Sequence, residues 1–197
     1  MDAVYKLYLD NKIKQSEWRI SLINQMNVLE SSGVNCLSCS GHCCTQKRNS
    51  MQITLAEGIA VYFDLKDKKL FDDHLKCKLQ KCIEDSRLDQ IIYIKNKALR
   101  RNYTCPLFEL KGFGCPLDKG NKPFGCLGYN ARSPNETEGE SCRSEIEILE
   151  STEDKFLNQI AELSKRISET LQLPLDKMTI PQMLLLIDSR MNSGPQS

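Results

Sequence analysis

The sequence has almost no net charge, few histidines and no long apolar run. Lysine and arginine number 27 against 26 aspartates and glutamates, and a net charge of +1 does not favour binding to nucleic acid or to an anionic membrane. No stretch approaches the roughly 18 consecutive apolar residues of a membrane span. The N-terminus lacks a basic leader followed by an apolar core and a cleavage site. We therefore expect a cytoplasmic protein that binds neither membranes nor nucleic acid.

Cysteine, in contrast, is abundant, with ten among 197 residues. Four of the ten fall within residues 36–44, whose sequence is CLSCSGHCC. A core that needs a small apolar side chain can use leucine, valine or alanine, so this density indicates sulfur chemistry. In a reducing cytosol such thiols are expected to be metal ligands or redox groups rather than disulfides.

Eight of the ten cysteines are candidate metal ligands. Cys77 and Cys82 are set aside, because they lie five positions apart in an expected helix and do not share a face. The candidates are Cys36, Cys39, Cys43, Cys44, Cys105, Cys115, Cys126 and Cys142. The spacing Cys36-x-x-Cys39 lets two thiolates reach one ion through a tight turn. Eight thiolates suit two four-coordinate sites, whereas one [4Fe–4S] cluster would use four.

The arrangement of the ligands stays open in three respects. Cys43 and Cys44 point in different directions, so two nearby ions, or one ion beside a free or bridging thiol, fit better than one ion holding both. His42 could replace a thiolate, although the cysteines fill the usual sites without it. Zinc, iron and copper(I) all accept thiolates, so the metal is not identified. A catalytic Cys–His pair is disfavoured, because it needs neither seven further cysteines nor an adjacent one.

The periodicity of apolar residues predicts a mainly α protein, folded as a single domain over residues 1–197. Helices over 1–32 and 145–192 would flank a cysteine-cluster metal-binding core at 36–143. Within that core we expect an irregular cysteine-rich region, with a short hairpin or loop, inserted between helices. Apolar runs on either side of Lys111-Gly112 are typical of such a hairpin.

Local signals predict two helices inside the core region. Thr54 followed by Glu57 is a capping box at the start of a helix from Leu55 to about Leu65. The pattern from Asp72 to Arg101 is also helical, with a break near Asp85-Ser86. The basic residues of this second stretch are interleaved with acids, so a solvated surface is favoured over a phosphate-binding face.

Beyond the core region, Ser151 and Asp154 are the capping signal of a long helix. Its apolar seam is expected to pair with the N-terminal helix and comprises Phe156, Ile160, Leu163, Ile167 and Leu171. Pro174 ends this helix. Thr179 with Pro181 starts a last one.

The cysteine motifs resemble those of the YkgJ-like CxxCxxxCC family. The resemblance covers residues 36–143 and rests on Cys36-x-x-Cys39-x-x-x-Cys43-Cys44, the Thr54–Glu57 helix start, Cys105-Pro106, Cys115, Pro123-x-x-Cys126 and Cys142-Arg143. The family is described as zinc- or iron-chelating, so the resemblance implies metal binding here. The family usually has Arg-Pro-x-x-Cys-Arg, but Lys122 and Leu127 replace the two arginines. Any role of those arginines in screening thiolates or binding an anion is therefore in doubt.

The expected function is chelation of zinc or iron, in a structural or interaction role with an unknown protein partner. The alternative is an iron–sulfur enzyme or protein-modification factor, since flagellin lysine methylating proteins carry a similar cysteine cluster. No glycine-rich nucleotide loop for a methyl donor supports that alternative. A redox-sensing interaction protein is a third interpretation, and the sequence does not decide whether the protein is an enzyme.

Overall fold

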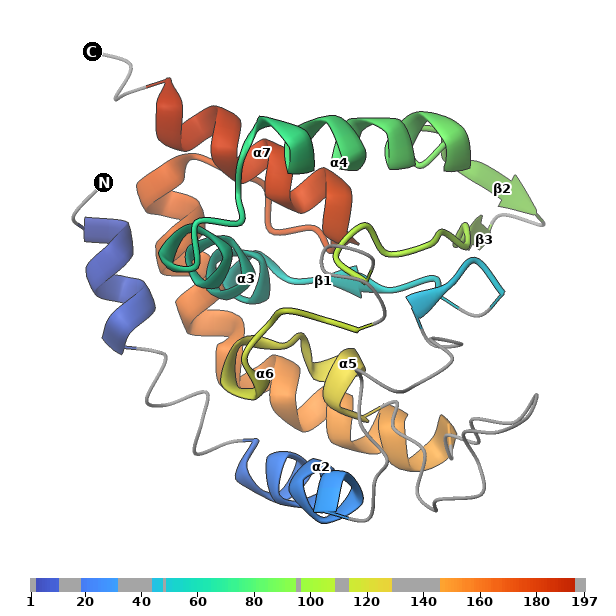
Figure 1. Cartoon of the computed structure of the whole chain (residues 1–197), viewed down its shortest axis with the longest axis vertical. Coiled ribbons are helices and arrows are strands. Elements are labelled where there is room, and N and C mark those ends of the chain that lie inside the picture. The colour runs from blue at the N-terminus through green and yellow to red at the C-terminus, as the bar shows by residue number, and fades with distance from the viewer. Residues whose placement is uncertain are drawn as a thin grey trace.

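The computed structural model describes residues 3–10, 19–31, 44–47, 49–94, 97–108, 114–128 and 146–193. Within these ranges the protein is mainly helical, as the sequence predicts (Figure 1). Residues 3–10 are helical. The labelled elements are α2 (Ile20–Ser31), β1 (Gln52–Ile53), α3 (Leu55–Asp67), α4 (Asp73–Ser86), β2 (Ile92–Ile94), β3 (Lys97–Leu99), η2 (Lys119–Asn121), α5 (Phe124–Gly128), α6 (Ile146–Leu171), β4 (Met178–Thr179) and α7 (Ile180–Asn192).

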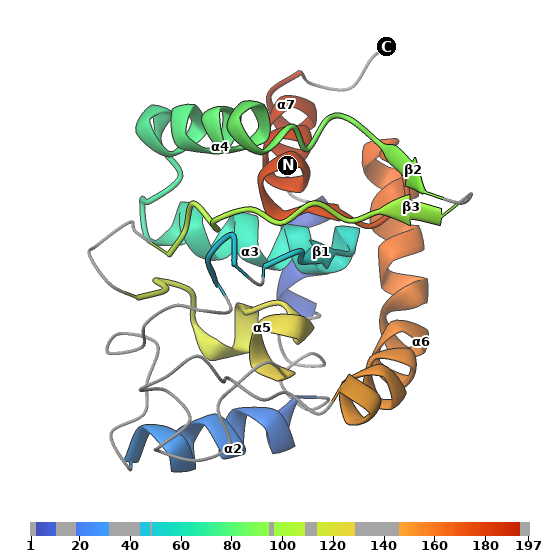
Figure 2. The ribbon, with the colours of Figure 1, turned by 90° about the vertical axis from the view of Figure 1, so that its right-hand side faces the viewer.

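Helix α3 is the centre of the fold. Every residue from Leu55 to Leu65 is buried, and the helix packs against both α6 and α7. Figure 2 shows α3 between α4 on one side and α5 on the other, with α6 running along the flank. The predicted capping box at Thr54 is confirmed, and the helix runs two residues beyond Leu65. A helix buried on all sides must satisfy its polar side chains internally, because water does not reach them.

The stretch after α4 differs from the sequence-based expectation. The helix breaks at Ser86 as predicted, where Arg87 adopts a left-handed conformation with φ 49°. Strands β2 and β3 then pair antiparallel, so the helix expected there was wrong. The run of isoleucine and tyrosine in β2 favours a strand over a helix. The hairpin expected around Lys111-Gly112 lies outside the described residues.

The terminal parts of the described chain close the core. Helix α6 begins at Ile146, so the start predicted from Ser151 was too late. Its predicted seam is buried. The first two residues of the seam, Phe156 and Ile160, pack with Phe124 and Leu22, and the later ones join the main core together with residues 3–10. Strands β1 and β4 pair antiparallel and hold the starts of α3 and α7 together. In the described part of the chain, no helix is long and apolar enough to cross a membrane.

A polar cluster joins three helices at the edge of this core. Asp188 of α7 accepts a hydrogen bond from the Tyr62 hydroxyl at 3.0 Å and an ion pair from Lys76 Nζ at 3.1 Å. Burial alone would raise the pKa of Asp188, but the bonds from Lys76 and Tyr62 and the charges of Lys76 and Lys66 outweigh it and hold the pKa below its usual value. The ionised carboxylate therefore stabilises the contact between α3, α4 and α7.

The close approach of α3 and α7 depends on Gly58. A Cβ at this position would overlap Met183 Cγ and would lie 3.0 Å from Ile187 Cδ1. We expect Gly58→Ala to lower the free energy of unfolding by about 1–2 kcal/mol. The steric overlap destabilises the folded state by more than the higher helix propensity of alanine stabilises it. Urea denaturation measures this. Gly125→Ala is the control, because its Cβ meets only the flexible sulfur end of Met51. A Gly58→Ala protein as stable as the wild type would contradict the packing argument.

Asp188→Asn should lower stability by about 1–3 kcal/mol at neutral pH, because a carboxylate in charged hydrogen bonds is lost. A carboxyl group whose pKa is lower in the folded than in the unfolded state stabilises the folded protein at pH values above its unfolded-state pKa, which is about 4. This stabilisation is lost as the pH falls through the folded-state pKa. The difference from the wild type should therefore shrink below about pH 4. Asp176→Asn, at an exposed loop carboxylate, is the control. A difference that is constant across the acid range would contradict the assignment.

Candidate metal centre

Half of the candidate ligands lie in the described part of the chain. These are Cys44, Cys105, Cys115 and Cys126. The remaining candidates lie outside the described residues, namely Cys36, Cys39, Cys43, Cys142 and the optional ligand His42.

Cys44 and Cys105 are brought together although they are far apart in the sequence. The backbone N–H of Cys105 donates to the Cys44 carbonyl at 2.7 Å, and the N–H of Tyr103 donates to the Asn49 carbonyl at 2.8 Å. The segment after the dense cysteine stretch therefore runs beside the segment that ends at Cys105. Cys44 and Cys115 both pack against the core cluster that contains Cys105. Since the charge of Cys115 also acts on the Cys105 thiol, Cys105 lies near both of these candidate ligands.

The thiol of Cys105 is the most buried of these groups. Its pKa is raised to about 12, chiefly by burial and also by the nearby charge of Cys115, although backbone hydrogen bonds from Leu107 and Phe108 oppose the shift. Without a cation beside it, Cys105 is therefore a neutral thiol at neutral pH.

Cys126 is positioned by a buried carboxylate of α3. It lies in α5, whose first residue, Phe124, donates its N–H to Glu57 Oε1 at 2.7 Å. The other oxygen, Oε2, accepts from the Thr54 N–H at 2.8 Å and from the Thr54 hydroxyl at 2.9 Å. Glu57 is only 4% exposed. One carboxylate therefore caps α3 and fixes the start of the helix that carries Cys126.

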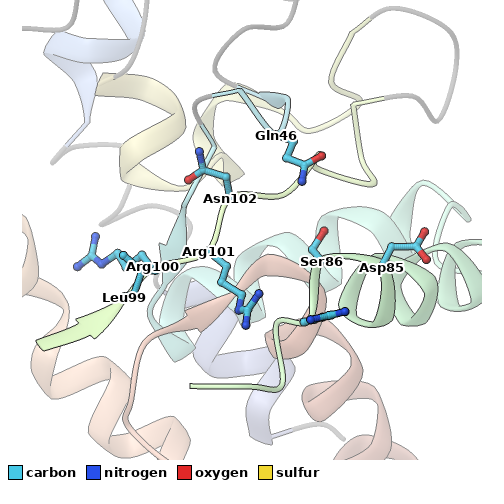
Figure 3. Close-up of a pocket in the computed structure, with 8 residues that line it drawn as sticks. Gln46, Asp85, Ser86, Leu99, Arg100, Arg101 and Asn102 are labelled. Carbon is cyan, nitrogen blue, oxygen red and sulfur yellow. The ribbon is translucent and has the colours of Figure 1, made fainter. Parts of the chain in front are cut away.

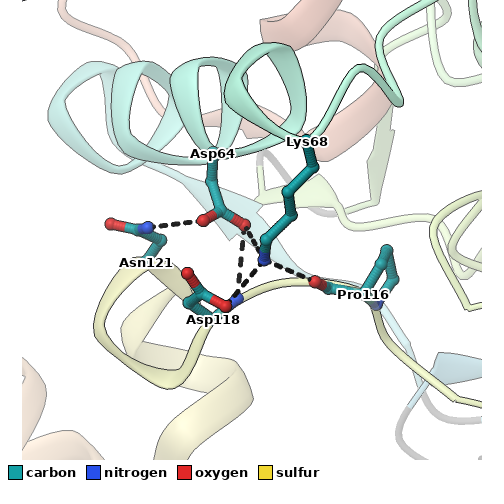
Figure 4. A network of polar contacts seen from close by, with 5 residues as sticks. All are labelled: Asp64, Lys68, Pro116, Asp118 and Asn121. Carbon is teal, nitrogen blue, oxygen red and sulfur yellow. Dashed lines mark hydrogen bonds and ion pairs between the residues drawn. The ribbon is translucent and has the colours of Figure 1, made fainter.

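A second carboxylate of α3 holds the loop between the third and fourth described cysteines (Figure 4). Asp64 Oδ1 accepts from the Asn121 amide at 2.7 Å, and Oδ2 accepts from Lys68 Nζ at 2.9 Å and from the Asp118 N–H at 3.2 Å. Lys68 also donates to the Pro116 carbonyl and to Asp118 Oδ1, both at 2.7 Å. Since residues seven positions apart share a helix face, Glu57 and Asp64 together anchor this loop to α3.

Arg19 is a residue that sequence reasoning missed. It is 1% exposed, and its Nη1 donates to the carbonyl of Lys122 and, at 3.3 Å, to that of Gly120. Burial lowers its pKa, while the negative charges of Glu57 and Cys126 oppose that shift. Neither position that flanks Cys126 in the family pattern holds arginine, yet the fold brings this guanidinium near the thiol. Arg19 lies in no motif, so no sequence signal pointed to it.

The two cysteines set aside from the ligand set differ from each other. Cys77 is exposed on α4. Cys82 is half-buried, and its sulfur lies 3.4 Å from the carbonyl oxygen of Thr104, next to Cys105. Burial raises the pKa of Cys82 to about 11, with a smaller opposing effect from Ser86. Cys82 therefore lies closer to the candidate centre than its helical spacing suggested.

The described thiols do not by themselves form a metal site. Within the ranges that the structure describes, no three Cys, His, Asp or Glu side chains come together in a group able to hold a metal ion. A complete ligand set would therefore require residues outside those ranges.

No known protein family, curated protein or solved structure matches this chain.

Replacement of Glu57 by alanine tests the carboxylate that links α3 to α5. The change leaves the buried N–H groups of Thr54 and Phe124 without their acceptor, and we expect a loss of about 2–4 kcal/mol in the free energy of unfolding. Glu162→Ala, at an exposed position of α6, is the matched control. Chemical denaturation with amide exchange at Phe124 measures both effects. Normal stability together with unchanged protection of the Phe124 amide would contradict this role.

Proposed function

We propose that this protein binds zinc or iron through its cysteine thiolates and that the ion serves a structural or interaction role. The observation that carries the proposal is that Cys105 lies beside two other candidate ligands: its backbone bonds to that of Cys44, and the charge of Cys115 acts on its thiol. Buried single cysteines often act as small apolar side chains. Neighbouring cysteines from separate segments, one of them the last residue of the stretch with four cysteines, favour a shared metal ion instead.

The proposed ligand set joins the described thiols to those of the dense stretch. From the described part it takes Cys44, Cys105, Cys115 and Cys126, and from outside that part Cys36, Cys39, Cys43 and Cys142. A metal cation supplies the positive charge that favours the thiolate form and offsets both burial and repulsion between neighbouring sulfurs. Soft thiolate donors suit zinc and iron. The resemblance to the YkgJ-like family implies the same metals.

The surroundings of the thiols support a structural role for the ion. Glu57 and Asp64 anchor the loop that carries Cys115 and Cys126, and backbone hydrogen bonds hold Cys44 beside Cys105. An ion bound by these segments cross-links parts of the chain that the core already brings together. Metal bound only to the folded state stabilises that state, so metal content and melting temperature should fall together.

The test combines elemental analysis and an absorption spectrum of protein purified without air with the melting temperatures of two variants. We expect Cys126→Ala to lose bound metal and to melt at a lower temperature. Cys77→Ala, at an exposed cysteine outside the ligand set, should retain both properties. About two zinc ions per colourless chain fit paired four-thiolate sites. Iron with sulfide and a band near roughly 400 nm indicates a thiolate-ligated cluster and favours the iron–sulfur alternative.

Two results would refute the proposal. The first is wild-type protein that contains no metal and takes up neither zinc nor ferrous iron when these are supplied without air. The second is Cys126→Ala protein with full metal content and an unchanged melting temperature, which would remove Cys126 from the ligand set.

A further inference from the structure

A pocket of about 720 Å³ opens between the end of α4 and the segment that follows β3 (Figure 3). Its lining comes from three parts of the chain and comprises Gln46, Asp85, Ser86, Arg87, Leu99, Arg100, Arg101 and Asn102. The volume lies in the range of small-molecule sites, roughly 300–1,000 Å³. None of the described residues that line it is a cysteine.

The pocket concentrates positive charge in a chain whose overall charge is nearly balanced. Among the described residues, three arginines and one carboxylate, Asp85, line it. Within the same part of the chain, none of these arginines forms an ion pair with a carboxylate, whereas Lys66, Lys68 and Lys76 do. The positive charge of these arginines, which no described carboxylate neutralises, therefore favours an anionic ligand in the pocket.

Arg101 provides the strongest indication. Its Nε is buried and has no hydrogen-bond partner within the described part of the structure. A buried donor without an acceptor is costly, so such groups are usually paired. Figure 3 shows Arg101 extending from the segment after β3 in the direction of the end of α4. The Nε itself has almost no accessible surface, so a ligand in the pocket would bind the terminal nitrogens of this guanidinium, which no carboxylate of the described residues neutralises.

The walls of the pocket are held in place before any ligand binds. The N–H of Gln46 donates to the Thr104 hydroxyl at 3.1 Å, and the sulfur of Cys82 contacts the Thr104 carbonyl. On the far side, the Gln182 amide donates to the Leu88 carbonyl at 2.9 Å, just after the end of α4. A site fixed in this way loses little conformational entropy on binding.

From these observations we infer that the pocket binds the phosphate group of a small phosphorylated molecule, held by Arg87 and Arg101. The guanidinium group offers paired donors that match phosphate oxygens, and Gln46, Ser86 and Asn102 supply neutral polar groups around it. The carboxylate of Asp85 is suited to accept a hydrogen bond from a ligand hydroxyl. A small molecule is favoured over a polynucleotide, because a polynucleotide requires a basic track along the surface and the net charge of the chain is only +1.

Titration calorimetry with the full chain in about 50 mM salt tests this inference. The probes are ADP, inorganic pyrophosphate, adenosine and a single-stranded RNA. We expect ADP and pyrophosphate to bind and adenosine, which has no phosphate, to show no binding. Arg101→Gln and Arg87→Gln should each weaken ADP binding about tenfold or more, because a charged hydrogen-bond donor is lost. Arg101→Lys should also weaken it, because the charge remains but the paired donors do not.

Arg166→Gln, at an exposed position of α6 outside the pocket, is the matched control and should change affinity less than about twofold. Arg87 is exposed, so Arg87→Gln keeps the test valid if Arg101→Gln fails to fold. Absence of binding by both ADP and pyrophosphate up to about 5 mM would overturn the inference. So would an equal loss in Arg166→Gln, or tighter binding of RNA than of ADP, which would indicate a polynucleotide ligand.

Discussion

The buried carboxylate of Glu57 is the constraint on which the arrangement of the cysteine-bearing segments depends. With one oxygen it caps α3 at Thr54, and with the other it accepts the N–H of Phe124 at the start of α5. Seven positions along the same face, Asp64 binds the loop that precedes α5. A buried carboxylate must be satisfied by several donors, and here Phe124, Asp118 and Asn121, between Cys115 and Cys126, supply one donor each. The polar groups of a buried helix thus determine where two candidate ligands lie.

The candidate metal centre and the arginine-lined pocket share a wall. Thr104 receives the backbone N–H of Gln46 on its hydroxyl and lies against the sulfur of Cys82 through its carbonyl. The next residue, Cys105, is buried in the core, whereas Arg101, three residues before Thr104, lines the pocket. Residues 101–105 therefore contribute to both the pocket and the candidate metal centre. The contacts of Thr104 hold this segment in place for both.

Local signals predicted some parts of this fold well. The capping box at Thr54 and Glu57, the break after Ser86 and the start of the last helix all depend on residues a few positions apart, whose hydrogen bonds and conformations are determined locally. The pairing of β2 with β3 was missed because short apolar runs suit a helix or a strand equally well by periodicity. The charge balance that argued against a phosphate-binding face is an average along the chain, whereas the pocket brings together Arg87, Arg100 and Arg101 beside Asp85.

The sequence by itself determined that the described part of the protein is mainly helical, because periodicity is a property of neighbouring residues, and the spacing of eight cysteines led to the prediction that they bind metal. Only the tertiary structure decided that Cys44 lies beside Cys105, that Arg19 approaches Cys126, and that Arg101, whose Nε has no partner among the described residues, lines a pocket. These contacts join residues that are distant along the chain or belong to no motif. Their energies depend on burial and on partners that exist only once the helices have packed around α3.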